Sequence, residues 1–525
     1  MDFWCKPSAV RVFKHTRKQK ADCARLSLHT GKNMYVSGQM LLREVECGFD
    51  VTDVVLAGVP EHVSAEICIQ DYAVFNDGRP YPDIQKPGKS VNVLSNTTQG
   101  IWLHVWVSTE AQEGIYPICC TVKTTRGDFT AHISLRIYPV VIPEPAKSEF
   151  GHEYFFCSTA YFSPEEHGAW TPPVTPFYDT YRYSDPWWEL MKNYAKAMKV
   201  LRVNSLNLPI MDFLVDAGSK RTGEKTWEFD FTLLDRFIEH FLQYGSFRYI
   251  TIGAMIASVY GETVIAVDEQ GHLVWYKTSE PQAEYWLRAV LGALYQHFTQ
   301  KGWLNMLHFR LEDEPHTSNV WLWAKEISDQ VAPGVVCGEP LDTHAISLEL
   351  AGKCNQYVPR LEVYASDPYF YRQRQAAGDT VWCYSCCFPE EDWWLNKFID
   401  LPHSYSRMIK WACYSQGITG FLHWGFNFWG EKTIYGIQPN ARYKGDGYIV
   451  YPDVENFDVM LSTRAVATRE GLYDWELLHM LGQKDAAAAL AISRSVARTF
   501  EDFTNDDTAP DAARVRLLEA ICTED

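Results

Sequence analysis

The chain has 525 residues and a net charge of -18, and its composition is 46% hydrophobic and 22% charged. A single core stops growing at roughly 250–300 residues, so this length predicts a globular protein of two or three domains. The acidic balance argues against nucleic acid or an anionic membrane as the main partner, because both bind basic surfaces.

The first twenty residues, MDFWCKPSAVRVFKHTRKQK, carry charges but lack the apolar stretch of a signal peptide. No run reaches the roughly 18 apolar residues of a membrane span. We therefore expect a cytoplasmic protein, in which the scattered cysteines are reduced. Cys383, Cys386 and Cys387 lie close together, but there is no second CxxC and no paired histidine. Buried thiols are favoured over zinc, and no metal or cofactor is expected.

Residues 1–145 are predicted to form an N-terminal β-sandwich. The runs IWLHVWV (101–107), ICCTVKT (118–124) and AHISLRIYPVVI (131–142) alternate with the period of two that strands show. Turn signals such as Asn76-Asp77-Gly78 separate such runs. Short strands without helical periods favour a sandwich. The segment IPEPAKSEF (142–150) has two prolines and no apolar period, which indicates a linker.

From residue 149 to about 455, strand-like runs alternate with amphipathic helical stretches, which predicts an α/β domain. The predicted strands are 153–158, 200–208, 249–254, 306–312, 334–340, 361–366, 381–387 and 418–425, and the clearest helices are 186–199, 231–245 and 282–302. Eight strands in this length fit a (β/α)8 TIM barrel. An open doubly wound sheet is the alternative, but no glycine-rich phosphate loop follows any strand.

The last segment, residues 456–525, is predicted to be helices packed on the barrel. The amphipathic stretches are YDWELLHMLGQ (473–483), DAAAALAISRSVARTFEDF (485–503) and AARVRLLEAIC (512–522). The expected architecture is therefore a multidomain chain of β-sandwich, TIM barrel and C-terminal helices.

The most informative motif is HFRLEDEPH (308–316), in which an apolar strand runs into Glu312, Asp313 and Glu314. Pro315 removes a backbone donor, so the strand is expected to end there. The acids then lie at the C-terminal end of strand four, where TIM barrels carry their active sites. Mutual repulsion and burial should raise at least one carboxyl pKa, as a general acid requires. A solvated acidic loop or helix cap is the alternative.

Two further strand ends carry candidate substrate-binding residues. GFLHWGFNFWG (420–430) ends strand eight with His423, Trp424, Asn427 and Trp429. Tryptophan can stack on a sugar ring and asparagine can bond hydroxyls, although core packing is the competing explanation. WCYSCCFPEEDWW (382–394) ends strand seven, where Tyr384 can donate a hydrogen bond to a substrate carbonyl. Glu390 and Glu391 are possible nucleophiles or the start of a surface helix.

With these motifs, the chain resembles glycoside hydrolase family 123 and the related DUF4091 domains. The similarity covers most of the chain: YPDIQKPG (81–88), GIWLHVWV (100–107) and EGIYPICCTV (113–122) in the sandwich, RLEDEPH (310–316), GITGFLHWGFNFW (417–429) and GDGYIVYP (445–452) in the barrel, and STRAVATREGLYDWELLHML (462–481) at the C-terminal end.

The resemblance implies a retaining β-N-acetylgalactosaminidase that acts by substrate-assisted catalysis on an oligosaccharide or glycoconjugate. In that mechanism the 2-acetamido oxygen of the substrate attacks the anomeric carbon. Glu314 would act as acid and then base, and Asp313 would orient the acetamide and stabilise the positive oxazolinium ion. Tyr384 would bond the acetamide oxygen.

Two other functions remain open on the sequence alone. One is a retaining glycosidase in which Glu390 or Glu391 is the nucleophile opposite Glu314, acting on a sugar with a free 2-hydroxyl. The other is a non-catalytic carbohydrate-binding protein, in which the aromatic residues bind glycan and the acids are structural.

Overall fold

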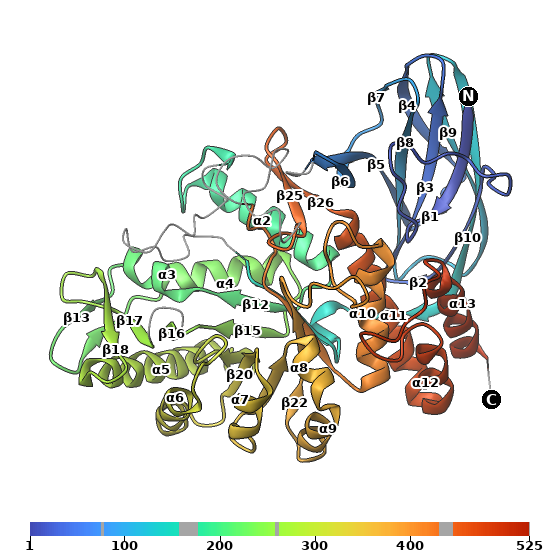
Figure 1. The fold of residues 1–525 in the computed structure, drawn as a ribbon. Helices are drawn as coiled ribbons and strands as arrows, with labels where there is room; N and C mark the ends of the chain where they lie inside the picture. Colours follow the sequence, from blue (N-terminus) through green and yellow to red (C-terminus); the bar gives the residue numbers. More distant parts are fainter. Residues whose placement is uncertain (75–77, 157–176, 258–261, 430–444, 524–525) are drawn as a thin grey trace. The chain divides into compact units, whose positions relative to one another are not determined.

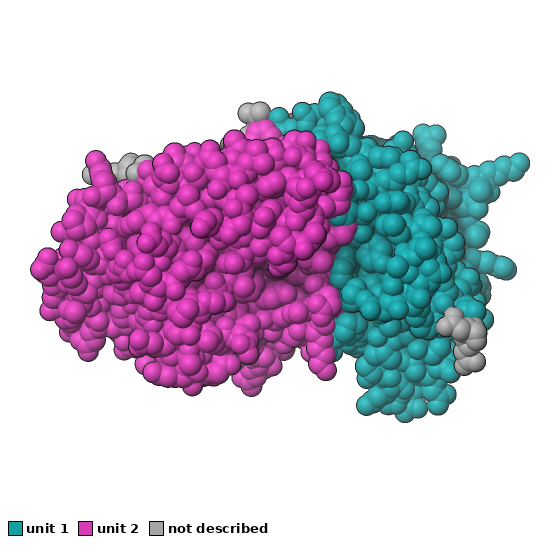
Figure 2. Space-filling view, turned by 90° about the horizontal axis from the view of Figure 1, so that it is seen from below, with its two compact units in different colours: residues 1–144, 390–416, 432–525 teal, residues 145–389, 417–431 magenta. Residues whose placement is uncertain are grey.

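The computed structural model describes residues 1–74, 78–156, 177–257, 262–429 and 445–523 (Figure 1). Two compact units account for the chain, and Figure 2 colours them separately. Unit 1 comprises residues 1–144, 390–416 and 432–525, and unit 2 comprises residues 145–389 and 417–431. The boundaries expected for three domains, 1–145, 149–455 and 456–525, stay a prediction.

The N-terminal part of unit 1 is the expected β-sandwich. One sheet has the order β1 (Asp2–Pro7), β3 (Met34–Glu44), β8 (Thr97–Val107), β5 (Val63–Val74) and β6 (Pro80–Pro87). The other has the order β2 (Arg25–Lys32), β10 (Gly127–Val141), β9 (Gly114–Thr124), β4 (Phe49–Ala57) and β7 (Val91–Val93). Neighbouring strands are antiparallel except for β2 and β10, which run parallel.

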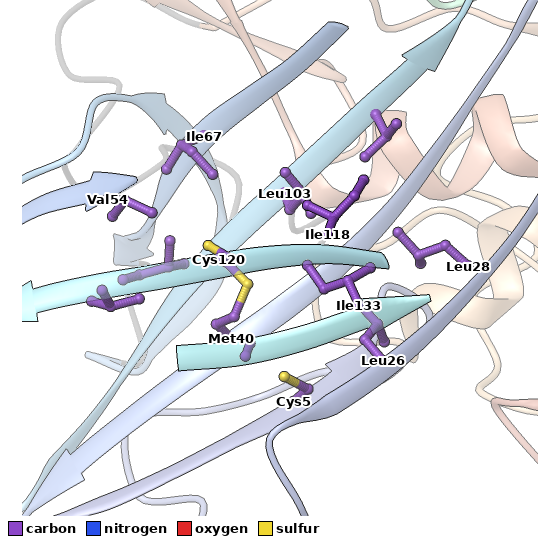
Figure 3. Close-up of a cluster of buried hydrophobic side chains, with 14 of the residues drawn as sticks. Cys5, Leu26, Leu28, Met40, Val54, Ile67, Leu103, Ile118, Cys120 and Ile133 are labelled. Atoms are coloured by element: carbon purple, nitrogen blue, oxygen red, sulfur yellow. The ribbon is translucent and has the colours of Figure 1, made fainter. Parts of the chain in front are cut away.

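The sandwich core lies between the two sheets, as Figure 3 shows. Met40, Ile67 and Leu103 come from the first sheet and Ile118 and Ile133 from the second, and all are buried. In β8 every second residue from Ile101 to Val107 belongs to this core. The period of two in the sequence therefore reflects burial of one strand face.

Helices dominate the rest of unit 1. After the hairpin of β25 (Val450–Asp453) and β26 (Asp458–Leu461) come α11 (Thr463–Lys484), α12 (Ala486–Arg494) and α13 (Ala509–Cys522), and α10 (His403–Gln416) packs on α11. Asp474 of α11 accepts bonds from Arg407, Trp411 and Arg514, which ties three helices together. The single helix predicted over 485–503 was wrong beyond Arg494. There the hydroxyl of Thr499 accepts backbone N–H groups and forms a turn.

Unit 2 contains the (β/α)8 barrel. The parallel strands follow the order β22 (Thr380–Val381), β21 (Gln356–Pro359), β20 (Val336–Leu341), β19 (Leu307–Phe309), β15 (Tyr249–Ile252), β12 (Ser205–Leu208), β11 (Gly151–Tyr154), β24 (Gly420–His423) and β23 (Cys383–Ser385). Strands β22 and β23 are one stretch of chain interrupted at Trp382, so the order closes on itself through eight strand positions. The predicted fold class is confirmed.

Trp382 fills the point of closure because its neighbours are glycines. A Cβ atom on Gly151 would lie 2.0 Å from the Trp382 ring, and one on Gly420 would lie 2.4 Å from it. The indole therefore occupies space that side chains on β11 and β24 would need.

The helices of unit 2 alternate with its strands. They are α2 (Asp185–Val200), α3 (Ile210–Asp216), α4 (Thr232–Tyr244), α5 (Pro281–Lys301), α6 (Ser318–Val331), α7 (His344–Glu349), α8 (Leu361–Ser366) and α9 (Pro368–Ala376), with 3-10 turns at Pro145–Lys147 and Leu304–Met306. Ser184 caps α2 by accepting the Trp187 N–H at 3.3 Å. Among the described residues, no helix is long and apolar enough to cross a membrane.

The strand predicted at 361–366 was wrong. This segment is helix α8, and strand six of the barrel is β21, which ends at Pro359. Leu361 and Tyr364 are both buried. They lie three residues apart, so the run LEVYAS suits a helix face as well as a strand.

Short strands extend the loops that follow strands two and three. They are β13 (Lys220–Arg221), β14 (Trp227–Glu228), β16 (Ile256–Ala257), β17 (Thr263–Val267) and β18 (Leu273–Lys277). The Trp227 indole donates to the carbonyl of Val267 at 2.7 Å and joins the two insertions. Ile256 pairs with Glu312, so this sheet adjoins the acidic motif.

Candidate active site

The three acids follow the C-terminal end of β19, the fourth barrel strand, as predicted. The regular strand ends at Phe309, and backbone hydrogen bonds continue beyond it. The Arg310 N–H donates to Ile252 at 2.9 Å, and the Ile256 N–H donates to Leu311 at 2.9 Å. Glu314 has a φ of 47°, a left-handed conformation, directly before Pro315. The chain therefore turns where the acidic motif ends.

Glu314 is half-buried and is in contact with Tyr384 of strand β23. The Tyr384 hydroxyl donates a hydrogen bond to Oε1 of Glu314. Burial and the charge of Asp313 raise the pKa of Glu314, whereas the bond from Tyr384 and the charge of Arg360 oppose the rise. A carboxyl that holds its proton above its ordinary range is suited to act as a general acid.

Asp313 is half-buried beside Glu314 and has a different electrostatic environment. Burial raises its pKa, the positive charge of Arg310 opposes that rise, and the charges of Glu153 and Asp342 add to it. The pKa values of both carboxyls are therefore raised, and the groups that oppose the rise differ: the charge of Arg310 for Asp313, and the hydroxyl of Tyr384 with the charge of Arg360 for Glu314. Different partners are how adjacent carboxyls are given different protonation states.

Glu312 is the most isolated of the three acids. Its side chain is 0% exposed, and neither carboxylate oxygen has a hydrogen-bond partner within the part of the chain that the structure describes. Burial, with the nearby charges of Glu262 and Asp313, raises its pKa to about 7. A buried carboxyl without donors takes up a proton because its charged form is poorly solvated.

The residues predicted on strand eight are mostly inside the protein. His423 and Asn427 are fully buried, and the Nδ1 of His423 lies 2.7 Å from the backbone oxygen of Ser385, next to Tyr384. Trp424 is half-buried, with its ring centre 5.5 Å from that of Phe428. The pairing of β23 and β24 sets His423 opposite Ser385, the residue that follows Tyr384.

Trp429 is only 1% exposed. Its ring meets that of Phe177 edge-on at 5.2 Å. This burial favours the packing explanation for Trp429, and its stacking on sugar stays a prediction.

Glu390 and Glu391 lie in an irregular loop of unit 1 and not at a helix start. Glu391 is exposed and Glu390 is half-buried. Among the described residues, no group of three or more histidine, cysteine or acidic side chains is placed to hold a metal ion. The sulfur atoms of Cys386 and Cys387 are 4.0 Å apart.

Four charged residues of the site were missed from the sequence. Arg360 follows β21 and is paired with Glu362. Glu153, Arg310 and Glu339 are buried within or directly after barrel strands. The sequence does contain a signal for them, namely charged residues inside otherwise apolar strands. Such residues are rarely buried without a partner, so they indicate a buried charged pair.

A closed (β/α)8 barrel with paired, electrostatically distinct carboxyls at one strand end is an arrangement suited to a glycoside hydrolase. The family model "Glycoside hydrolase 123, catalytic domain" matches residues 170–481, more than half of the chain. The chain therefore belongs to glycoside hydrolase family 123, which confirms the resemblance drawn from its motifs.

One solved structure has the same fold. A family 123 glycoside hydrolase from Clostridium perfringens, studied for glycolipid glycan hydrolysis, aligns with a TM-score of 0.78 at 15% identity, covering 99% of this chain and 98% of that chain. At this identity the likeness shows the fold. The endo-β-1,4-mannanase of Thermotoga petrophila aligns with a TM-score of only 0.35, at 11% identity over 64% of this chain and 78% of its own. No curated protein matches the chain.

Proposed function

We propose that this enzyme hydrolyses β-linked N-acetylhexosaminides, with N-acetylgalactosaminides as the first choice, by a retaining, substrate-assisted mechanism. The observation that carries the proposal is the adjacency of Asp313 and Glu314 in two different electrostatic environments at one strand end. The Clostridium perfringens relative is described as acting on glycolipid glycans, which supports a glycoconjugate substrate.

Adjacent residues are too close to act from opposite faces of a sugar. Successive residues of an extended chain rise by about 3.3 Å and the carboxyl groups of a nucleophile and an acid are roughly 5 Å apart with the sugar between them. Asp313 and Glu314 can instead both contact one side of the scissile bond, where the 2-acetamido group and the leaving oxygen lie. The acetamide oxygen is then the nucleophile.

The roles follow from the two environments. Glu314, protonated, donates its proton to the leaving oxygen and later takes one from the attacking water. Asp313, with the guanidinium of Arg310 opposing its protonation, orients the acetamide N–H and stabilises the positive oxazolinium ion. Tyr384 holds Glu314 in place in the free enzyme. His423, Trp424, Asn427 and Trp429 are proposed to complete the sugar site from strand eight.

The deciding experiment uses a thiazoline analogue of N-acetylgalactosamine, which mimics the bicyclic intermediate. It should inhibit competitively and bind more tightly than substrate, and Asp313→Asn should weaken it because a neutral amide stabilises the ring charge poorly. A matched screen compares 2-acetamido with 2-hydroxyl chromogenic glycosides. Cleavage of neither class would support a binding protein.

The conventional mechanism is tested in parallel with a 2-fluoro sugar. A covalent glycosyl-enzyme trapped on Glu390 or Glu391 would overturn the proposal. Replacing both glutamates with glutamine should leave the hydrolysis of acetamido substrates largely intact.

A further inference from the structure

The segment that carries the catalytic pair leaves its strand ladder just before the acids. Strands β19 and β20 pair only at His308–Val336 and Phe309–Cys337. Beyond that point the N–H of Leu311 has no backbone partner on β20. It donates instead to Oε1 of the Glu339 side chain at 2.6 Å. The Glu339 carboxyl group thus replaces the backbone acceptor of the strand ladder, at a position two residues before Asp313.

Glu339 has the environment of an uncharged acid. It is 0% exposed, and its second oxygen, Oε2, is also buried. Burial raises the pKa of Glu339 well above its ordinary range, even though the side chain of Trp321, the N–H of Leu311 and the charge of Arg310 oppose the rise. An ionised carboxylate would be costly here, because the groups that favour its charged form do not offset the lost solvation. A neutral amide could accept the same bond.

Glu153 holds the same segment from β11 and is ionised. Its oxygens accept bonds from Arg310 Nη2 at 2.8 Å, Ser205 Oγ at 2.5 Å and Thr251 Oγ1 at 2.9 Å. Burial raises its pKa, but the charge of Arg310 and these donors outweigh burial and bring the pKa below its ordinary range. The buried guanidinium of Arg310 is stabilised by this negative charge, so an amide at position 153 would be a poorer partner than Glu153.

We propose that Glu153 and Glu339 are positioning residues that hold Asp313 and Glu314 in their working geometry from two sides. Glu153 acts as an ionised partner of the Arg310 side chain, and Glu339 acts as an uncharged acceptor for the Leu311 backbone. The inference rests on the proposed catalytic roles of Asp313 and Glu314.

The charged residues around Asp313 shift its pKa in opposite directions. The charged or titratable groups around Asp313 are Arg310, Glu312 and Glu314 on its own segment, Glu153 from β11, and Glu339 and Asp342 from β20 and its end. Arg310 lowers the pKa of Asp313 and Glu153 raises it, and the effect of Arg310 is the larger. Asp313 works ionised, so its pKa sets the acidic limb of the kcat/KM profile.

The experiment measures kcat, KM and the pH profile with an aryl N-acetylgalactosaminide. Glu339→Leu should lose tenfold or more in kcat with little change in KM, because a displacement of about 1 Å can cost roughly 10²-fold in rate. Glu339→Gln should recover most of that loss. Glu153→Gln should move the acidic limb to lower pH, whereas Arg310→Gln should move it to higher pH.

Contrary results are equally clear. Equal losses in Glu339→Gln and Glu339→Leu, or full activity in both, would refute the role of Glu339. Shifts of the acidic limb in one common direction would refute the role of Glu153, since a merely structural defect gives no opposed signs. Thermal unfolding is recorded for each variant. Where Glu153→Gln fails to fold, the comparison of Glu339→Leu with Glu339→Gln decides whether the positioning role is correct.

Asp313→Asn and Glu314→Gln belong in the same series to separate this inference from the proposed function. Wild-type turnover in those two variants would mean that the proposed function is wrong. Loss of turnover in them, together with unaltered kinetics in the Glu339 and Glu153 variants, would mean that only the positioning role is wrong.

Discussion

Replacing Tyr384 with phenylalanine tests the assignment of Glu314 as the general acid. The hydroxyl of Tyr384 donates to Oε1 of Glu314, and the ring is packed with Val358, Trp382 and Leu422. Phenylalanine keeps the ring and removes only the donor. A hydrogen bond to a charged group contributes about 1.5–3 kcal/mol, and one pKa unit corresponds to about 1.4 kcal/mol. The loss is therefore worth about one to two pKa units.

The sign of the shift follows from which form the hydrogen bond favours. The bond lowers the pKa of Glu314, so its loss raises that pKa. Because Glu314 must be protonated to donate, the alkaline limb of kcat/KM should move to higher pH by about one to two units. The assay is hydrolysis of an aryl N-acetylgalactosaminide between pH 4 and 10, with the free-enzyme limb taken from kcat/KM.

A matched control is Tyr357→Phe. Its hydroxyl donates to the backbone oxygen of Leu350 at 2.8 Å, and its ring is fully buried. This variant loses a comparable buried hydroxyl without touching Glu314, so its limb should stay at the wild-type position. An alkaline limb in Tyr384→Phe that stays in place or moves to lower pH would mean that another group is the general acid.

The remaining predictions concern four side chains. Glu314→Gln should lower the turnover of unactivated substrates by roughly 10²–10⁴-fold. The first step should slow least for dinitrophenyl glycosides. Hydrolysis of an unactivated glycoside at the wild-type rate would refute the role of Glu314 as general acid. Glu312→Gln should stabilise the fold by up to about 3 kcal/mol above pH 7 and by little at pH 4.5. The reason is that the Glu312 carboxyl has a higher pKa in the folded state than in the unfolded chain, so its ionised form destabilises the fold above pH 7. Denaturant unfolding at both pH values checks this. Trp424→Ala and Trp429→Ala should raise KM. Trp429→Ala should also lose about 3–5 kcal/mol of stability, and if that loss came with an unchanged KM, Trp429 would be a core residue.

The sandwich and most barrel strands could be predicted from the sequence because their periods record burial directly. The alternation in IWLHVWV matches the core face of β8, and the apolar run before Glu312 matches β19. The run at 361–366 was mispredicted because Leu361, Val363 and Tyr364 satisfy both a strand and a helix pattern over six residues. Only tertiary context selects between the two at that length.

The acidic motif could be predicted from the sequence, but the residues that contact it could not, and the reason is physical. Three consecutive acids after an apolar strand can be recognised locally. Glu153 and Glu339 accept hydrogen bonds from Arg310 and Leu311 although they lie far away in the chain, and a lone glutamate in a strand carries no mark of its partner. The contact of Tyr384 with Glu314 likewise joins residues 70 positions apart. Such pairings depend on barrel closure, which sequence periods do not encode.

Three consecutive glutamate and aspartate residues would ordinarily repel one another and titrate as a group. Here the barrel gives each a different neighbour: none for Glu312, a guanidinium for Asp313 and a phenol for Glu314. Burial raises the pKa of both Asp313 and Glu314, and different groups oppose the rise at each: the guanidinium of Arg310 at Asp313, and the hydroxyl of Tyr384 at Glu314. Neither carboxyl is placed to attack from the far side of the sugar. For this reason we propose a substrate that brings its own nucleophile in its acetamide group.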